Sequence, residues 1–214
     1  MGERAESGVS NALPGVILAG GLARRMGGGD KGLRRLQGRP LLSHVIDRLA
    51  PQVTALALNA NGPPERFHGF GLTVLPDPVA GFVGPLAGIL AAMDWAAGLG
   101  ADRVVTAAAD TPFLPRDLVA RLTRAVQGRD LPLALAATAG PEGQMRHPTF
   151  GLWPVALRND LRQALSDGTR KVTQWADQHG VGAAVFPAAP VDPFFNINTP
   201  ADLDRAAVLA ASLS

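Results

Sequence analysis

Cysteine is absent from this chain of 214 residues, which excludes disulfide bonds, zinc–thiolate sites and thiol nucleophiles. Tyrosine is also absent, and only Lys31 and Lys171 among the 20 basic residues are lysines. Few groups therefore titrate between roughly pH 7 and 11, so a formal net charge of +2 suffices for a pI of about 9.9. Because the arginines are scattered rather than clustered, the high pI does not indicate a nucleic-acid-binding protein.

No apolar run approaches the roughly 20 residues that a membrane-spanning helix needs. The opening MGERAESGVSNALP is polar and carries two glutamates, unlike a signal or transit peptide, and Glu6 stands where a myristoylation signal needs Ser or Thr. We therefore expect a cytoplasmic protein without membrane contact. We also expect residues 1–13 to form a flexible tail and residues 14–214 to form one domain, since no repeat or long linker divides them.

Short β-like apolar runs alternate with longer helical patterns along most of the chain. This alternation predicts an α/β fold of three layers, with helices on both faces of a mostly parallel sheet. The expected strands are Gly15–Ala19, Val53–Leu58, Leu72–Leu75, Arg103–Ala109, Leu133–Ala137, Pro148–Trp153, Ala183–Phe186 and Phe194–Ile197. The expected helices are Pro40–Leu49, Pro85–Ala97, Pro115–Val126, Val155–Ser166, Val172–His179 and Pro200–Leu213.

Polar residues stand at the ends of three of these strands, namely Asn59, Asp77 (after Pro76) and Asp110. The carboxyl ends of parallel strands share one edge of the sheet, and open α/β folds bind their ligands there. Either aspartate could instead be an ordinary turn residue, because each lies next to a proline or a Thr-Pro pair. The coincidence of three such strand ends favours a ligand site.

The stretch GVILAGGLARRMGGGDKGL, from Gly15 to Leu33, leaves the first strand with little side-chain bulk and three cations, Arg24, Arg25 and Lys31. Backbone N–H groups of such a loop can surround phosphate oxygens, and the cations can add charge-assisted hydrogen bonds. A solvated flexible loop is the plain alternative. Position favours phosphate binding, because the loop leaves a strand and faces the aspartates of two others.

Two common phosphate-binding motifs do not fit this loop. A dinucleotide fingerprint needs Gly-x-Gly-x-x-Gly opening a helix, with an acidic residue about 20 positions later. A P-loop needs Gly-Lys followed by Ser or Thr, whereas Lys31 stands between Asp30 and Gly32. The sequence therefore indicates neither a dehydrogenase nor a P-loop NTPase.

The loop does resemble the signature of nucleotidyltransferases with a Rossmann-like, GT-A-type fold, and is most similar to that of the MobA family of molybdenum cofactor guanylyltransferases. Further motifs stand in that family's order and spacing, and the resemblance covers about Pro14 to Ala206. These motifs are NAN from Asn59, LPD from Leu75, GPLAGIL from Gly84, ADTPFLP from Ala109, RHPTF from Arg146 and FNINTP from Phe195.

The resemblance implies transfer of GMP from MgGTP to the terminal phosphate of molybdopterin, which yields the guanine dinucleotide cofactor and pyrophosphate. It implies Mg²⁺, with Mn²⁺ as an alternative ion, at Asp110, and a catalytic set of Arg25, Lys31 and Asp110. The implied GTP-binding residues are Leu18, Ala19, Gly20, Lys31, Asn59, Asp77 and Asp110. The implied molybdopterin-binding residues are Arg25, Gly28, Gly84, Asn196 and Asn198.

On this basis residues 14–110 serve mainly GTP and residues 111–214 mainly molybdopterin, with transient contacts to molybdenum-insertion proteins or molybdoenzyme chaperones. The nearest alternatives are a molybdopterin cytidylyltransferase and other nucleotidyltransferases of the same fold. The ending NINTP, rather than a DIDTP-like one, favours the guanine enzyme. Two further alternatives are not nucleotidyltransferases, namely a non-catalytic GTP-binding protein and a structural α/β module.

The missing Ser-His-Asp and Cys-His sets agree with this chemistry. The second pKa of a phosphate monoester is about 6, so the nucleophile is already ionised near neutral pH. Asn196 and Asn198 are two residues apart, which places both side chains on one face of an extended strand. Their plainer role would be to cap the helix that opens at Pro200.

Overall fold

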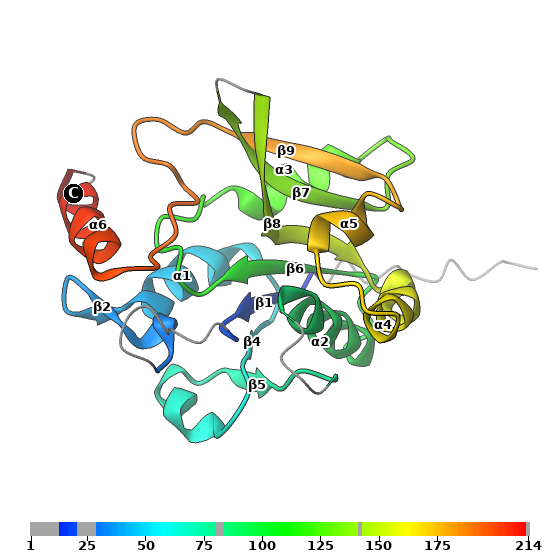
Figure 1. Ribbon diagram of the computed structural model, residues 1–214, viewed down its shortest axis with the longest axis horizontal. Coiled ribbons are helices and arrows are strands. Elements are labelled where there is room, and N and C mark those ends of the chain that lie inside the picture. The colour runs from blue at the N-terminus through cyan, green and yellow to red at the C-terminus, as the bar shows by residue number, and fades with distance from the viewer. Residues whose placement is uncertain (1–12, 21–28, 80–83, 141–142, 213–214) are drawn as a thin grey trace, which may run out of the picture.

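The computed structural model describes residues 13–20, 29–79, 84–140 and 143–212. Arg25, Gly28 and nearly all of the expected N-terminal tail lie outside these ranges. A seven-stranded sheet in the order β5-β4-β1-β6-β8-β7-β9 forms the centre of the molecule (Figure 1). The strands are β1 Gly15–Leu18, β4 Leu56–Asn59, β5 Thr73–Leu75, β6 Arg103–Ala108, β7 Leu133–Gly140, β8 Gly143–Pro154 and β9 Val181–Phe186.

Every pair of neighbouring strands is parallel except the two pairs that β8 makes with β6 and β7. The mostly parallel α/β sheet predicted from the sequence is therefore confirmed. The alternation of side chains along β1 directs Ile17 and Val16 into the apolar clusters on opposite faces of the sheet.

Helices cover both faces of the sheet and complete three layers (Figure 1). On the face of Ile17 pack α1 (Leu41–Leu49) and α3 (Leu118–Val126). On the face of Val16 pack α2 (Pro85–Gly98), α4 (Arg158–Ser166) and α5 (Val172–Ala176). Among the described residues, no helix combines the length and the apolar character required to cross a membrane.

The C-terminal helix α6 (Pro200–Ser212) lies outside these layers, beside the small hairpin of β2 (Arg35–Leu36) and β3 (Arg39–Pro40) (Figure 1). A third apolar cluster joins the helix to this hairpin and includes Leu36, Phe113, Ile197 and Ala206. After β9 the chain therefore returns to the carboxyl edge of the sheet near β1 and β6. There the backbone N–H of Ile197 donates to the carbonyl oxygen of Asp110 at 3.0 Å.

The strand predicted over Phe194–Ile197 is wrong, because these residues form a loop without a strand partner. Asp192 shapes that loop by accepting the Phe194 N–H at 2.9 Å, a local bond that competes with strand pairing. Arg39 and Pro40 do not open α1 either. They form β3 after a tight turn in which Gln37 and Gly38 have positive φ values of 49° and 78°.

The remaining predicted elements are present with shifted ends. α3 begins three residues after the expected Pro115, and the expected helix from Val155 divides into a short 3-10 helix and α4. The 3-10 helices were not predicted, since segments of three to seven residues leave too few positions for a periodic apolar pattern. They are η2 Lys31–Leu33, η3 Ala50–Gln52, η4 Pro64–Phe70 and η5 Val155–Leu157.

Gly182 in β9 allows α3 to approach the sheet, and we expect Gly182→Ala to lower thermal stability. An added Cβ would lie 2.6 Å from the backbone oxygen of Ala125 in α3, a group that cannot rotate away. Overpacking of this kind costs about 1–3 kcal/mol, which a thermal melt would register as a lower Tm. Gly98→Ala is the matched control, because a Cβ there meets nothing within 4 Å. An equal Tm for both variants would contradict this account of the α3 contact.

Candidate active site

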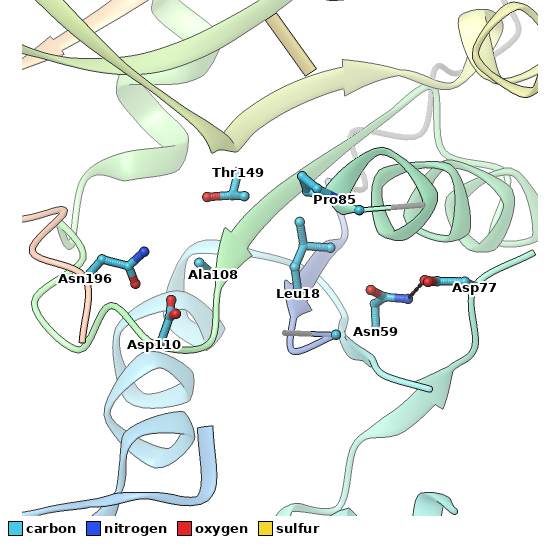
Figure 2. Close-up of a pocket in the computed structure, with 10 residues that line it drawn as sticks. Leu18, Asn59, Asp77, Pro85, Ala108, Asp110, Thr149 and Asn196 are labelled. Atoms are coloured by element: carbon cyan, nitrogen blue, oxygen red, sulfur yellow. Dashed lines mark hydrogen bonds between the residues drawn. The ribbon is translucent and has the colours of Figure 1, made fainter. Parts of the chain in front are cut away.

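A cavity of about 290 Å³ opens beyond the carboxyl ends of β1 and β6 (Figure 2). The chain leaves β1 toward β4 on one side and later returns to β6 on the other, so this is the point at which the strand order reverses. Such a switch point is where open α/β sheets bind ligands. The cavity is lined by Leu18, Gly20, Asn59, Asp77, Gly84, Pro85, Ala108, Asp110, Thr149 and Asn196.

At one end of the cavity, two asparagines hold the carboxylate of Asp77. Asn59 Nδ2 donates to one carboxylate oxygen at 2.9 Å, and Asn61 Nδ2 donates to the other at 2.7 Å. The backbone N–H of Asp77 returns a bond to Asn61 Oδ1 at 2.9 Å. These three bonds fix the orientation of the carboxylate, and Figure 2 shows the one that Asn59 donates.

Asn59 reaches this position because helix α2 leaves room for it. The side chain is 3% exposed and also donates to the carbonyl oxygen of Leu75 at 3.1 Å. It lies against Gly88 of α2, where an added Cβ would come within 2.3 Å of Asn59 Oδ1. Glycine at this one helical position therefore accommodates the amide that holds Asp77.

At the other end of the cavity, Asp110 follows β6 and meets the cation of Lys31 (Figure 2 shows Asp110). Lys31 Nζ lies 3.3 Å from Asp110 Oδ2 and donates to Asn198 Oδ1 at 2.5 Å. Burial raises the pKa of the Asp110 carboxyl, and the charge and hydrogen bond of Lys31 oppose that rise. The pair thus places a largely buried anion and its cation at the switch point.

Asn196 completes this end of the cavity. With its nitrogen turned toward Asp110, the amide donates to both carboxylate oxygens, at 2.9 and 2.5 Å. With its oxygen turned inward, as Figure 2 draws it, the amide and the carboxylate present only oxygen atoms to the space between them. The first orientation suits the bare carboxylate, and the second suits a bound cation.

The alternative prediction, that Asn196 and Asn198 cap helix α6, is wrong. Thr199 provides the cap, since its Oγ1 accepts the N–H of Asp202 at 3.1 Å. Asp202 in turn accepts the N–H groups of Asn198 and Thr199 at 2.9 and 2.8 Å, which completes a reciprocal capping box and lowers the pKa of Asp202. Both asparagine side chains are thereby left for the pair formed by Lys31 and Asp110.

The other predicted site residues contribute mainly through their backbone. The N–H of Ala19 donates to the carbonyl of Asn59 at 2.8 Å, and its side chain is buried. Gly20 and Gly84 line the cavity, and Gly84 has φ of 83° just before Pro85 opens α2. A residue with a side chain would be strained in that conformation.

Sequence reasoning did not assign Pro85, Ala108 or Thr149 to the site, although all three line the cavity. Thr149 belongs to the RHPTF motif, which the sequence analysis identified without assigning a role to this residue. Two residues earlier, His147 stacks on Phe194 with 4.3 Å between the ring centroids, and burial lowers the pKa of the imidazole. This stacking ties β8 to the loop that carries Asn196.

Taken together, the mostly parallel sheet and a switch-point cavity with carboxylates at both ends define an α/β nucleotidyltransferase. The chain belongs to the family of the MobA-like NTP transferase domain, whose model matches residues 15–181.

Curated relatives extend over almost the whole chain. A molybdenum cofactor guanylyltransferase of Bradyrhizobium sp. (strain ORS 278) is 58% identical over 208 residues, which are 96% of each chain. The molybdenum cofactor guanylyltransferase of Cereibacter sphaeroides is 48% identical and covers 91% of this chain and 95% of its own.

Solved structures share the fold. The molybdopterin-guanine dinucleotide biosynthesis protein A of Archaeoglobus fulgidus superposes with a TM-score of 0.73 at 22% identity, covering 94% of this chain and all of its own. A 4-diphosphocytidyl-2C-methyl-D-erythritol synthase of Anaerococcus prevotii gives a TM-score of 0.71 at 13% identity, over 94% of this chain and 96% of its own. At these identities the likeness shows the fold alone.

We expect Gly88→Ala to weaken nucleotide binding by displacing Asn59 from Asp77. The new methyl group would overlap the amide oxygen, so the amide must turn and release the carboxylate. Loss of a hydrogen bond to a charged group corresponds to roughly a tenfold or greater loss in affinity, measurable by calorimetric titration of the nucleotide.

The control for Gly88→Ala is the double variant Gly88→Ala/Asn59→Ala, which has space for the methyl group and still lacks the amide. It should bind the nucleotide no better than Gly88→Ala, because both variants lack the bond from Asn59 to Asp77. Normal affinity in Gly88→Ala would show that the position of Asn59 does not matter for the ligand.

Proposed function

We propose that the protein transfers GMP from GTP to molybdopterin, forming molybdopterin guanine dinucleotide and pyrophosphate. The observation that carries this proposal is the pre-oriented Asp77 carboxylate at one end of the cavity, with a cation and a second carboxylate at the other end. The curated relatives named molybdenum cofactor guanylyltransferase, at 48–58% identity, support it.

The proposed base-binding group is the carboxylate of Asp77. Guanine presents two adjacent donors, N1–H and the 2-amino group, which a carboxylate can accept together. Adenine and cytosine present an unprotonated ring nitrogen on the corresponding edge, which a carboxylate repels. Because Asn59 and Asn61 already hold both oxygens, the carboxylate cannot easily turn away from a wrong base. This arrangement favours guanine over cytosine.

The proposed phosphate-binding group is Lys31, supported by the backbone of Leu18, Ala19 and Gly20 at the end of β1. A charge-assisted contact to a phosphate oxygen would replace the contact that Lys31 makes with Asp110. Arg25, which we propose as a catalytic and molybdopterin-binding residue, lies outside the described residues.

The proposed metal ligand is Asp110, holding Mg²⁺ or Mn²⁺. No group of three or more acidic or histidine side chains that could hold a metal occurs among the described residues. A single carboxylate nevertheless fits Mg²⁺, which commonly takes one or two carboxylates and completes its shell with phosphates and water. Asn196 can add an amide oxygen by turning its carboxamide. When bound, the ion would neutralise charge on the departing pyrophosphate.

The proposed acceptor site lies where residues 111–214 meet the sheet edge. The cavity is lined there by Asn196, Gly84 and Thr149, whose side chain adds a hydroxyl group. Asn198 lies nearby, since it accepts a hydrogen bond from Lys31. Gly28, which we also propose for this site, lies outside the described residues. Amides can donate to a phosphate and accept from a pterin, which suits a ligand carrying both groups.

These residues position reactants rather than move protons. The acceptor phosphate is already ionised near neutral pH, so the attack on the α-phosphorus needs no general base. In this proposal Lys31 draws the triphosphate to one end, Asp77 holds the base at the other, and Asn196 and Asn198 hold the acceptor beside Asp110. Transfer then depends on alignment and on neutralising the charge that develops.

GTP should be used at least about 100-fold better than CTP or ATP, because the wrong base leaves the Asp77 carboxylate without donors. The measurement is pyrophosphate release with molybdopterin, Mg²⁺ and each nucleotide in turn. Comparable turnover with CTP would instead assign the protein to the cytidylyltransferases, and no release with any nucleotide would favour a binding protein without catalysis.

Asp110→Asn should remove most transfer activity with little change in thermal stability, because the substitution deletes charge without changing volume. Lys31→Met should lower kcat/KM for GTP roughly 10- to 150-fold, the range for loss of a charge-assisted hydrogen bond. Asp94→Asn is the control, since that carboxylate binds Arg162 at 2.8 Å outside the cavity lining. Near-normal rates in both site variants would remove Lys31 and Asp110 from the mechanism.

A further inference from the structure

Arg66 lies in η4 beside the cavity, and its guanidinium contacts two loops that belong to different ends of the site. Its Nε donates to Asp30 Oδ2 at 2.6 Å, and its Nη2 donates to Asp30 Oδ1 at 3.3 Å. Nη2 also donates to the carbonyl oxygen of Asn61, and Nη1 donates to that of Pro63. One planar group is therefore bonded to a carboxylate and to two backbone carbonyls.

The two loops joined by Arg66 carry the groups proposed to bind opposite ends of the nucleotide. Asp30 immediately precedes Lys31, the proposed phosphate cation. Asn61 donates to Asp77, the proposed guanine acceptor, and receives the Asp77 N–H in return. Arg66 itself is not among the residues that line the cavity. Any effect on the nucleotide must therefore pass through Asp30 and Asn61.

The surroundings of Arg66 are shaped to hold its guanidinium flat. The group lies over the ring of Phe67 at 4.6 Å from the centroid, and Phe67 is buried. On the loop side, Gly62 has φ of 82°, and a Cβ there would lie 3.4 Å from Nη1. The side chains of Arg66 and Asp30 are 27% and 19% exposed, so their ion pair is partly shielded from water.

We infer that Arg66 is a positioning residue for guanine selectivity, which holds Asn61 so that Asp77 keeps its orientation and holds Asp30 so that Lys31 stays aligned. The inference rests on the proposed function, because it assigns Asp77 to guanine. Four N–H bonds made by one rigid fork fix the spacing of the two loops, which a flexible lysine with a single ammonium cannot reproduce. Selectivity for the base should therefore depend on arginine itself and not on its charge.

The experiment compares calorimetric titrations of GTP and ITP, without molybdopterin, for the wild type, Arg66→Met and Arg66→Lys. ITP lacks the 2-amino group and keeps N1–H, so the ratio of the two affinities reports how well Asp77 is placed. Arg121→Met is the matched control. Arg121 also binds an aspartate, at 2.6 Å from Nε to Asp117, and lies over a phenylalanine ring, but it is remote from the cavity lining.

The wild type should bind GTP about tenfold or more tightly than ITP, the effect of one hydrogen bond to a charged group. Both Arg66 variants should reduce that ratio to about threefold or less, mainly by weakening GTP binding. Arg66→Lys should retain more affinity than Arg66→Met for both nucleotides, because it keeps a cation beside Asp30. Arg121→Met should leave the ratio unchanged.

An unchanged GTP-to-ITP ratio in both Arg66 variants would overturn the inference, whether the affinities fall together or not. Thermal melts accompany the titrations, and Arg66→Lys alone decides the matter if Arg66→Met does not fold. A wild type that does not distinguish GTP from ITP would contradict the proposed binding of guanine by Asp77, on which the inference rests. The wild-type titrations therefore test that part of the proposed function, and the ratio between variants and wild type tests Arg66.

Discussion

The parallel pairing of β1 with both β4 and β6 is the constraint on which the site depends. In this register Leu18 stands opposite Asn59 on one side and Ala108 on the other. The ladder continues past the strand ends, where the Ala19 N–H donates to Asn59 at 2.8 Å and the Ala109 N–H donates to Leu18 at 3.0 Å. Three chain segments thus leave the sheet at one level, and the cavity is lined there by Gly20, Asn59 and Asp110, which lie at these strand ends or within two residues of them.

The electrostatics of the cavity follow from that convergence. Carboxylates at both ends are paired inside the protein, with amides at Asp77 and with a lysine and an amide at Asp110. A buried carboxylate without partners would cost several kcal/mol or take up a proton. The partners of Asp110 are the same groups proposed to contact phosphate and acceptor. Ligand binding at that end would therefore exchange internal contacts for ligand contacts, and the proposed metal ion would replace Lys31 as the positive charge beside Asp110.

Much of this arrangement could be predicted from the sequence, because strand ends are local features. Asn59, Asp77 and Asp110 were expected at one edge of the sheet from the apolar runs before them, and all three line the cavity. The approach of Asn196 and Asn198 to Lys31 and Asp110 needed more than local pattern. It depends on the return of the chain after β9, on the capping box at Thr199 and on the packing of α6 against Leu36.

The contacts that sequence reasoning missed are mostly long-range and involve groups with common structural roles. Arg66 follows two prolines in a polar stretch and has no periodic neighbour, so nothing in its local sequence points to Asp30, 36 residues earlier. Thr149 lies in a recognisable motif, yet only the antiparallel course of β8 brings it beside Ala108 and Asp110. Such contacts are set by topology, which a single sequence constrains only through the order of its elements.

Glycine supplies space in this site as well as conformational freedom. At Gly88 a methyl group would displace Asn59, and at Gly62, where φ is 82°, it would contact the guanidinium of Arg66 at 3.4 Å. Gly88 lies within a helix, where glycine costs about 1 kcal/mol relative to alanine. At Gly88 this loss of helix stability accompanies the space that lets the buried Asn59 amide reach the Asp77 carboxylate. Gly88 and Gly62 thus differ from a described glycine with open space around it, such as Gly38 in the turn between β2 and β3, because they give room to polar side chains of the site and its surroundings.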